Sequence, residues 1–490
     1  SAHVVQTRIE YGSVDIARPA AACRDSLCRN RSPAMRELLQ SKIRIALPAM
    51  LAIQSFGTMC SFAAAVVAVQ AAADLGVKAT SIGIYMAVLY VVGMLTGLGA
   101  GSFLARFGVI RICQAALLAA AMGLWLAGAI PIWWMALSSA ALIGLAMGPL
   151  NPASSRILAR HAPERWQPLV FSLKQTGTPM GGMLAGLLLP PLMALYDWRI
   201  AIVAITVLPL LTLFGVQVIR NDLDDDRDPS YPISLAGVAD SLRVIVRSKP
   251  LLTLAAAGYF YTFTQMAILA FIVIYLEEAN DLSTEFAGGI FAIIHGSAIP
   301  ARIAWGAVAG RFLRSWVLLG LIGIMMSASI VAMSFFSPAW PFWLTALIAV
   351  MLGASTNGVL GLLLSEFSRL APPGKVGEVV GGGQFFLFFG IVSGPPVFGA
   401  MIEFGGGYTN AFYLIAAASF AAGVYLLLTA RRGRVRCTCR REHALASQPG
   451  CAKIEHGMLY CDGNGSPFII NANHINLKNK AMAQCGNICT

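Results

Sequence analysis

Long apolar runs alternate with short polar segments along most of the chain. The runs lie at 45–70, 81–104, 109–129, 132–155, 169–194, 199–220, 251–276, 286–308, 315–336, 341–366, 377–402 and 409–430. A transmembrane helix needs about 20 apolar residues to cross a hydrocarbon core about 30 Å thick. Membrane β-strands are instead short segments of alternating polarity. The pattern therefore predicts an all-α membrane protein with twelve transmembrane helices.

Polar interruptions divide the chain into bundles and connecting segments. The longest break between runs, 221–250, separates six runs from six and is expected to form a cytoplasmic central loop. It leaves an N-terminal bundle at 41–220 and a C-terminal bundle at 251–430. Residues 1–40 and 431–490 contain too few apolar residues to bury a core, so we expect both to be disordered cytoplasmic segments.

The two halves repeat one pattern. The stretch "APERWQPLVFSLKQ", which ends at Gln175, aligns without gaps with "APPGKVGEVVGGGQ", which ends at Gln384. Asn151 and Asn357 also occupy corresponding places in their halves. Such repeats are typical of transporters made of two related bundles, with a binding site near mid-membrane between them. The expected architecture is therefore two pseudo-symmetric six-helix bundles.

Composition and charge support a membrane protein with a defined orientation. The chain is 57% hydrophobic and 12% charged, whereas soluble domains have about 25% charged residues. The net charge of +12 does not indicate nucleic acid, because the basic residues gather in alternate loops, namely Arg106, Arg111, Arg156, Arg160, Arg165, Arg311, Arg314, Arg369 and Lys375. Basic loops favour the cytoplasm. We therefore expect a multi-pass membrane protein with both termini cytoplasmic, and we take the membrane to be a bacterial inner membrane.

Several function classes lack their motifs. The chain has no Gly-x-x-x-x-Gly-Lys-Ser/Thr loop, so no ATP-driven pump is indicated. It has no HExxH, no Ser/His/Asp arrangement and no paired carboxylates within a span, so an enzyme is not expected. Six of the ten cysteines follow residue 436, at spacings that match no zinc module. We expect no metal and no cofactor.

One loop carries a family signature. The stretch "GSFLARFGVIR" resembles the Gly-x-x-x-Asp-Arg-x-Gly-Arg-Arg loop between spans two and three of the major facilitator superfamily. Gly101, Arg106, Gly108 and Arg111 match that loop, whereas Ala105 stands in place of the usual acid. A second copy in the other half, "GAVAGRFLR", keeps Gly306 and Arg311.

The resemblance covers about residues 40–432 and implies a mechanism. In that family two bundles rock around a central site, and the signature loops lock the cytoplasmic side in the outward-open state. The resemblance thus makes gating-loop candidates of Gly101, Arg106, Gly108, Arg111, Gly306 and Arg311. The alternative is that the arginines only anchor the topology.

The same resemblance implies that spans 1, 4, 7 and 10 line the cavity and that spans 2, 5, 8 and 11 form the seam between bundles. Polar residues within apolar runs fall on those spans. The candidates for substrate binding are Gln54, Asn151, Lys174, Gln175, Tyr261, Gln265, His295, Asn357 and Gln384. Each has a structural alternative, because a lone amide in a span often joins helices.

Three ionisable residues within the spans need explanation. A lysine within a span costs about 2.5–3.5 kcal/mol on insertion scales, so Lys174 either binds an anion from the aqueous path or serves as an anchor or internal lock. We favour the aqueous path, since Pro179 frees a backbone carbonyl and loosens the helix nearby. Arg302 is expected to snorkel to the cytoplasmic end. His295 is a candidate protonation switch.

The sequence therefore predicts a secondary active transporter that moves a small organic solute, with an anion among the options, by alternating access. Two alternatives stay open: a drug or metabolite efflux antiporter of the same fold, and a receptor-like member that does not transport. The expected partners are a small-molecule substrate and the lipid bilayer, with a coupling proton as an option and no nucleic acid. A monomer is expected.

Overall fold

The computed structural model describes residues 42–162, 167–224, 227–231, 238–309, 311–372 and 375–446, with the short pairs 460–461 and 467–468. Within these residues, twelve helices are long and apolar enough to cross a membrane. The predicted fold class is therefore confirmed. The expectation for residues 1–40 lies outside the described residues.

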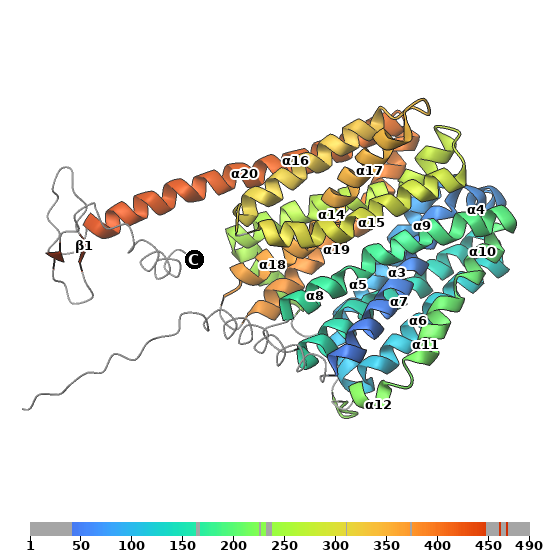
Figure 1. Ribbon diagram of the computed structural model, residues 1–490, viewed down its shortest axis with the longest axis horizontal. Helices are drawn as coiled ribbons and strands as arrows, with labels where there is room; N and C mark the ends of the chain where they lie inside the picture. The colour runs from blue at the N-terminus through green and yellow to red at the C-terminus, as the bar shows by residue number, and fades with distance from the viewer. Residues whose placement is uncertain are drawn as a thin grey trace, which may run out of the picture.

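The N-terminal bundle occupies the lower half of Figure 1. Its elements are α3 (Ile43–Val66), α4 (Ala68–Leu75), the 3-10 helix η1 (Ala79–Ser81), α5 (Ile82–Phe107), α6 (Val109–Ala129), α7 (Trp133–His161), α8 (Gln167–Gln175), α9 (Gly177–Leu195), α10 (Trp198–Ala204), α11 (Val207–Gly215) and α12 (Arg220–Leu223).

The C-terminal bundle occupies the upper half. It contains α14 (Lys249–Glu278), α15 (Thr284–Val308), α16 (Ser315–Ser334), α17 (Phe342–Thr356), α18 (Leu360–Leu370), α19 (Val376–Phe404) and α20 (Tyr408–Ala446), and α13 (Val238–Arg247) precedes it. Two short strands, β1 (Tyr460–Cys461) and β2 (Pro467–Phe468), pair antiparallel. Helix α20 continues past residue 430, where disorder was expected, and projects beyond the helix array (Figure 1).

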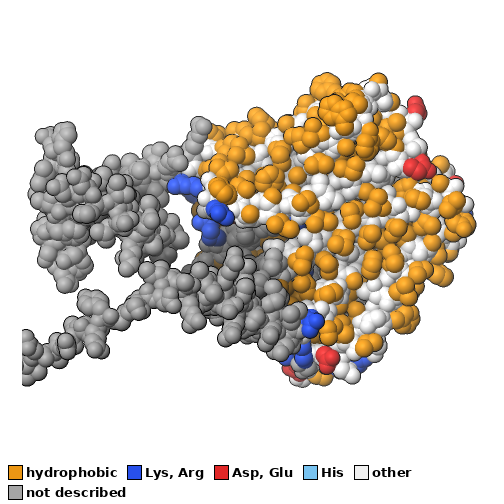
Figure 2. Space-filling model, in the orientation of Figure 1, with side chains coloured by type: hydrophobic (Ala, Val, Ile, Leu, Met, Phe, Trp, Pro, Cys, Tyr) orange, Lys and Arg blue, Asp and Glu red, His pale blue; other side chains and the backbone are white. Residues whose placement is uncertain are grey.

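Charged side chains mark two opposite ends of the helix array. We call one the arginine end, where helices finish beside Arg106, Arg160, Arg311 and Arg369, and the other the acidic end, which carries Asp74, Glu278 and Glu403. Figure 2 shows blue side chains at the left and along the bottom, where some red ones accompany them, further red side chains at the right, and a broad hydrophobic surface between the two ends. That surface suits lipid contact, because the helices satisfy their own backbone hydrogen bonds. The protein is therefore a multi-pass membrane protein.

Several expected continuous helices are interrupted. The fifth span divides into α8 and α9 at Thr176, and the tenth divides into α17 and α18 after Thr356. In the fifth span, Pro179 has no N–H, so the carbonyl of Gln175 loses its i+4 donor. Non-helical backbone at membrane depth is tolerated where it is buried in protein, so both breaks place free carbonyls inside the molecule.

The bundles meet along a seam that is packed toward the acidic end. Helix α5 packs on α19, and α9 packs on α15, as the resemblance implied for spans 2, 5, 8 and 11. Glycines allow the close approach: a Cβ on Gly83 would lie 2.7 Å from the carbonyl oxygen of Pro395, and one on Gly186 would lie 2.5 Å from that of Gly288. Any side chain at these glycines would separate the bundles.

The seam helices are open toward the arginine end. Ideal Cβ atoms on Gly101, Gly306, Gly377 and Gly381 would meet no described heavy atom within 4 Å. At the acidic end, by contrast, the ammonium of Lys78 lies 3.4 Å from the carboxylate of Glu403 across the seam. Among the described residues, the bundles are therefore in contact at the acidic end, whereas these glycines at the arginine end are uncovered.

Candidate functional site

A line of hydrogen-bonded polar groups crosses the seam within the membrane spans. We call it the seam network, and it comprises Asn151, Ser155, Lys174, Gln175, Gln265, Arg302 and Asn357. The first four come from α7 and α8 of the N-terminal bundle. The other three come from α14, α15 and the break between α17 and α18. Residues up to 206 positions apart in the sequence thus form one group.

Lys174 is held inside the N-terminal bundle. Its side chain is 1% exposed, and its ammonium donates to the carbonyl oxygen of Asn151 at 3.1 Å, to the side-chain oxygen of the same residue, and to the hydroxyl of Ser155 at 2.8 Å. An ammonium has three hydrogens, so these bonds use all of them. Lys174 does not face open space in this structure, contrary to expectation, and its contacts are those of an internal lock.

Arg302 spans the two bundles, although the sequence suggested a snorkelling anchor. Its side chain is 8% exposed. Nε donates to the carbonyl of Asn357 at 3.0 Å, and Nη1 donates across the seam to the carbonyl of Gln175. Nη2 has no hydrogen-bond partner among the described residues. Arg302 was not among the predicted substrate-binding residues, and the signal for it in the sequence was the carbonyl that Pro179 frees.

The repeat explains why both cations find acceptors. Asn151 and Asn357 correspond between the halves, and the backbone carbonyl of each accepts a hydrogen bond from a buried cation on a seam helix. Asn357 lies in the break between α17 and α18, where the regular ladder is interrupted. Asn151 instead adds its side-chain oxygen to the carbonyl. Each bundle therefore binds one cation at the same place in its fold.

Two amides of the site keep unused polar atoms. Gln265 donates through Nε2 to the side-chain oxygen of Asn357, whose Nδ2 then has no partner in the described part of the chain. Asn357 is 2% exposed. On the other side, Gln54 donates weakly to Thr178 at 3.4 Å, and its Oε1 has no partner within the described ranges. A buried polar group without a partner costs about 1–3 kcal/mol, so these atoms are suited to a ligand.

His295 lies at the seam in an aromatic enclosure. It is fully buried, its Nδ1 lies 3.1 Å from the carbonyl oxygen of Phe291, and its ring centroid lies 4.7 Å from that of Phe62 in the other bundle. A Cβ on Gly182 would lie 2.1 Å from its ring. The ring is therefore a packing contact between bundles, and it has no described hydrogen bond to the seam network.

Two expected site residues lie apart from the network. The hydroxyl of Tyr261 donates to the carbonyl of Leu319 on α16 at 2.9 Å, and the side chain is fully buried within the C-terminal bundle. Tyr261 is therefore wrong as a cavity residue, because it points away from the seam. Gln384 is half-buried on α19, and none of the described hydrogen bonds joins it to the network.

The first gating loop receives its acid from elsewhere. Gly108 has φ +92°, and the carboxylate of Asp224 lies against it. That carboxylate accepts from the backbone N–H of Ile110 at 2.8 Å and of Arg111 at 3.4 Å, at the start of α6. Partial burial raises the pKa of Asp224, and these N–H groups oppose the rise. An acid at a helix N-terminus is favourable, so Asp224 supplies a carboxylate to the loop that has Ala105.

Arg106 and Arg311, the two arginines offered as gating candidates, are placed alike. The guanidinium of Arg106 lies 5.8 Å from the ring centroid of Phe107, and that of Arg311 lies 5.3 Å from that of Phe312. Arg111 is exposed at the start of α6. The described contacts of Arg106 and Arg311 stay within their own loops, which is consistent with an arginine end that is open.

The network carries uncompensated positive charge. Lys174 and Arg302 donate only to carbonyl, amide and hydroxyl oxygens in the described structure. A buried acid of the spans, Glu366, is already bound by Arg369 at 2.8 Å. Buried charges are costly unless they are paired. The arrangement can therefore bind an anion between the bundles.

Known proteins resemble this chain along most of its length. The sequence profile of the Major Facilitator Superfamily matches residues 51–381. A hexuronate transporter of Bacillus subtilis (strain 168) is 22% identical over 290 residues, which cover 56% of this chain and 67% of that protein.

Solved structures share the fold. A bacterial homologue of the human lysosomal transporter Spinster, in an inward-facing and occupied conformation, has a TM-score of 0.64 at 14% identity and covers 79% of this chain and 97% of its own. The human organic anion transporter TETRAN has a TM-score of 0.58 at 14% identity, and the match covers 79% of this chain and 100% of that one. With its twelve apolar spans, this chain is a membrane transporter of a small molecule rather than an enzyme, and it belongs to the Major Facilitator Superfamily.

Proposed function

We propose that the protein is a secondary active transporter that moves a small organic carboxylate by alternating access. One observation carries the proposal: among the described residues, Arg302 and Asn357 each keep a buried donor without a partner, beside two cations that no described carboxylate neutralises. A solute carboxylate accepts hydrogen bonds through two oxygens. It would use Nη2 of Arg302 and Nδ2 of Asn357 together.

Binding at this position would act on the contact between the bundles. The bond from Arg302 to the carbonyl of Gln175 joins the N- and C-terminal bundles. A carboxylate is a stronger acceptor than a neutral carbonyl, because charge-assisted hydrogen bonds are about twice as strong. A solute carboxylate held at Nη2 would therefore draw the guanidinium away from the carbonyl of Gln175, which accepts from Nη1. A ligand shifts a two-state equilibrium only through such a difference between states.

The membrane orientation, the substrate class and the coupling ion form part of the same proposal. If the arginine end is cytoplasmic, as the basic loops favour, both termini lie in the cytoplasm of a bacterial inner membrane and the structure is inward-open. The hexuronate transporter supports a sugar acid as substrate. One chain encloses the network, which supports a functional monomer. Protons are the coupling ion we favour, because a carboxylate solute can itself carry one.

The alternatives fit the network less well. An efflux antiporter for cationic drugs would need a buried carboxylate at the site, whereas the described network holds Lys174 and Arg302. A receptor-like member would bind solute without turnover. Transport by purified protein separates that case from ours.

Uptake into proteoliposomes tests the proposal. We expect concentrative uptake of glucuronate, or of a related carboxylate from a panel with galacturonate and gluconate, driven by an inward proton gradient. Glucose has the same ring without the carboxylate and should not compete at a hundredfold excess. Equal competition by glucose, or transport of cationic amphiphiles with no carboxylate moved, would contradict the proposal. Saturable binding without uptake would support the receptor-like alternative.

A further inference from the structure

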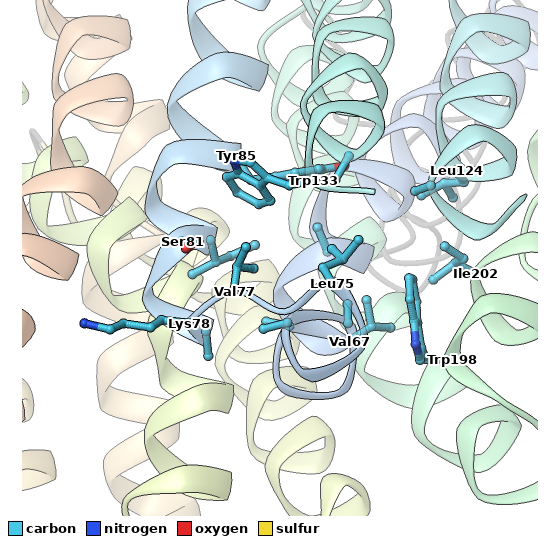
Figure 3. Close-up of a pocket in the computed structure, with 18 residues that line it drawn as sticks. Val67, Leu75, Val77, Lys78, Ser81, Tyr85, Leu124, Trp133, Trp198 and Ile202 are labelled. Atoms are coloured by element: carbon cyan, nitrogen blue, oxygen red, sulfur yellow. The ribbon is translucent and has the colours of Figure 1, made fainter. Parts of the chain in front are cut away.

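A cavity lies within the N-terminal bundle at the acidic end, away from the seam network. It has a volume of about 60 Å³ and lies beneath α4, between that helix and parts of α5, α6, α7 and α10. Figure 3 shows Val67, Leu75, Leu124 and Ile202 around it, with Trp133 and Trp198 at its edges. The walls are mainly apolar, so an occupant must be apolar where it is buried.

Polar groups of the wall are already engaged. The hydroxyl of Tyr85 lies 3.3 Å from that of Ser139, and the indole N–H of Trp198 donates to Asp74 at 2.7 Å. Asp74 belongs to α4, and the bonds from Trp198 and Arg199 hold the pKa of its carboxyl below the usual range. These bonds fix α4 as the roof of the cavity. They leave the wall with little to offer a polar ligand.

The mouth of the cavity carries a cation. Lys78 lines the cavity with its stem, and its side chain is 75% exposed. In Figure 3 its amino group points away from the other lining residues. The amino group lies 3.4 Å from Glu403 of α19. An apolar cavity with an exposed cation at its edge complements an alkyl chain that ends in a carboxylate.

The same wall closes the seam at the acidic end. Lys78, Ser81 and Ile82 line the cavity. Between them, the hydroxyl of Thr80 donates to Glu403, and a Cβ on Gly399 would lie 3.2 Å from the carbonyl oxygen of Thr80. One short segment therefore faces the cavity on one side and the opposite bundle on the other.

We propose that this cavity binds the alkyl chain of a medium-chain carboxylate, whose head group takes Lys78 from Glu403 and so loosens closure at the acidic end. A single water needs about 10–15 Å³ of such volume, so the cavity accepts the end of one chain rather than the two chains of a phospholipid. Exposed ion pairs are weak, so a carboxylate anchored by its chain can displace Glu403. The site is independent of the proposed substrate.

Tryptophan quenching by 10-bromodecanoate tests the site, because Trp133 and Trp198 line it. The full-length protein in detergent should show saturable quenching by 10-bromodecanoate. The affinity for 10-bromo-1-decanol, measured in the same way, should be at least fivefold lower. Ala72→Leu fills the cavity and should abolish the saturable part. Ala73 lies on the same helix outside the lining, so Ala73→Leu should bind as the wild type does. Unchanged quenching in Ala72→Leu would overturn the proposal.

The ion pair gives a second test that does not depend on filling the cavity. Lys78→Gln should lower the affinity for 10-bromodecanoate at least fivefold, to that of the alcohol. Lys78→Arg keeps the positive charge and should retain most of the wild-type affinity. Glu403→Gln removes the competing carboxylate and should strengthen binding at least twofold. Equal affinity for acid and alcohol in the wild type, or weaker binding in Glu403→Gln, would refute the role of Lys78.

Discussion

The two buried cations of the seam, Lys174 and Arg302, differ in how many hydrogen-bond donors have no described partner. The ammonium of Lys174 donates its three hydrogens to Asn151 and Ser155. Arg302 has five donors, makes described bonds to Asn357 and Gln175, and keeps Nη2 free of described partners. A residue without a spare donor cannot hold a solute unless its own contacts break. We therefore assign Lys174 to stability and Arg302 to binding.

Matched substitutions should separate the two roles. Arg302→Gln removes a charge-assisted bond worth about 1.5–3 kcal/mol, so the KM for the transported carboxylate should rise about tenfold or more. Lys174→Gln should lower the melting temperature and change KM less than threefold, because the lysine makes no described contact with open space. Both quantities are measured on the same purified variants. A larger increase in KM for Lys174→Gln than for Arg302→Gln would show that the lysine contacts the solute, and would contradict its assignment to stability.

At the scale of elements, helix breaks provide the acceptors that hold the seam. The break between α8 and α9 exists because Pro179 cannot donate to Gln175, and the freed carbonyl accepts from Arg302 of the other bundle. The break between α17 and α18 exposes Asn357 to the same guanidinium. Each break is thus part of a contact between elements, and its geometry determines where Arg302 lies.

Restoring the helix should weaken the contact between bundles. Pro179→Ala supplies an N–H that can bond the Gln175 carbonyl, so it competes with Arg302. We expect the turnover rate to fall severalfold while expression is retained. Pro191 lies on the same helix and is exposed, so Pro191→Ala is the matched control. Similar rates for both variants would show that the freed carbonyl is not needed for transport.

At the scale of the whole molecule, the described residues of the two bundles are in contact at the acidic end and leave seam-helix glycines uncovered at the arginine end. Closure rests on close glycine contacts such as that of Gly83 with Pro395 and on the pair of Lys78 with Glu403. At the other end Gly381 faces open space in the described structure. We propose that Arg106 and Arg311 stabilise the opposite, outward-open state, since their described contacts here stay within their own loops.

Loss of either arginine should then favour the open arginine end. In a cysteine-free background with Gly381→Cys as reporter, Arg106→Ala and Arg311→Ala should each raise the labelling rate by a polar maleimide at least twofold. Lys375→Ala serves as control, because this exposed lysine pairs only locally with Glu378 at 3.4 Å in the described structure. Wild-type labelling in both arginine variants would reduce them to topology anchors.

The resemblance to the major facilitator superfamily implied which spans form the seam, whereas the sequence by itself determined the twelve spans and the two halves. These features rest on local hydrophobic length and on a repeat that keeps Asn151 and Asn357 in register. It also pointed to Pro179 as the source of a free carbonyl. Most of the polar residues that the sequence offered as site candidates are buried inside the protein, because burying polar groups in lipid is costly wherever they lie in the chain.

The tertiary structure alone decided which polar residue has a free donor. Lys174 is satisfied by residues 19 and 23 positions earlier, and Arg302 reaches a carbonyl 127 positions away. The hydroxyl of Tyr261 donates to Leu319 within the C-terminal bundle, and the carboxylate of Asp224 accepts from the backbone N–H of Ile110 beside the loop that has Ala105. Whether a hydrogen-bonding group is satisfied depends on neighbours in space, and helix packing sets those neighbours. A sequence shows that a lysine lies in a span, and only packing shows what its three hydrogens bind.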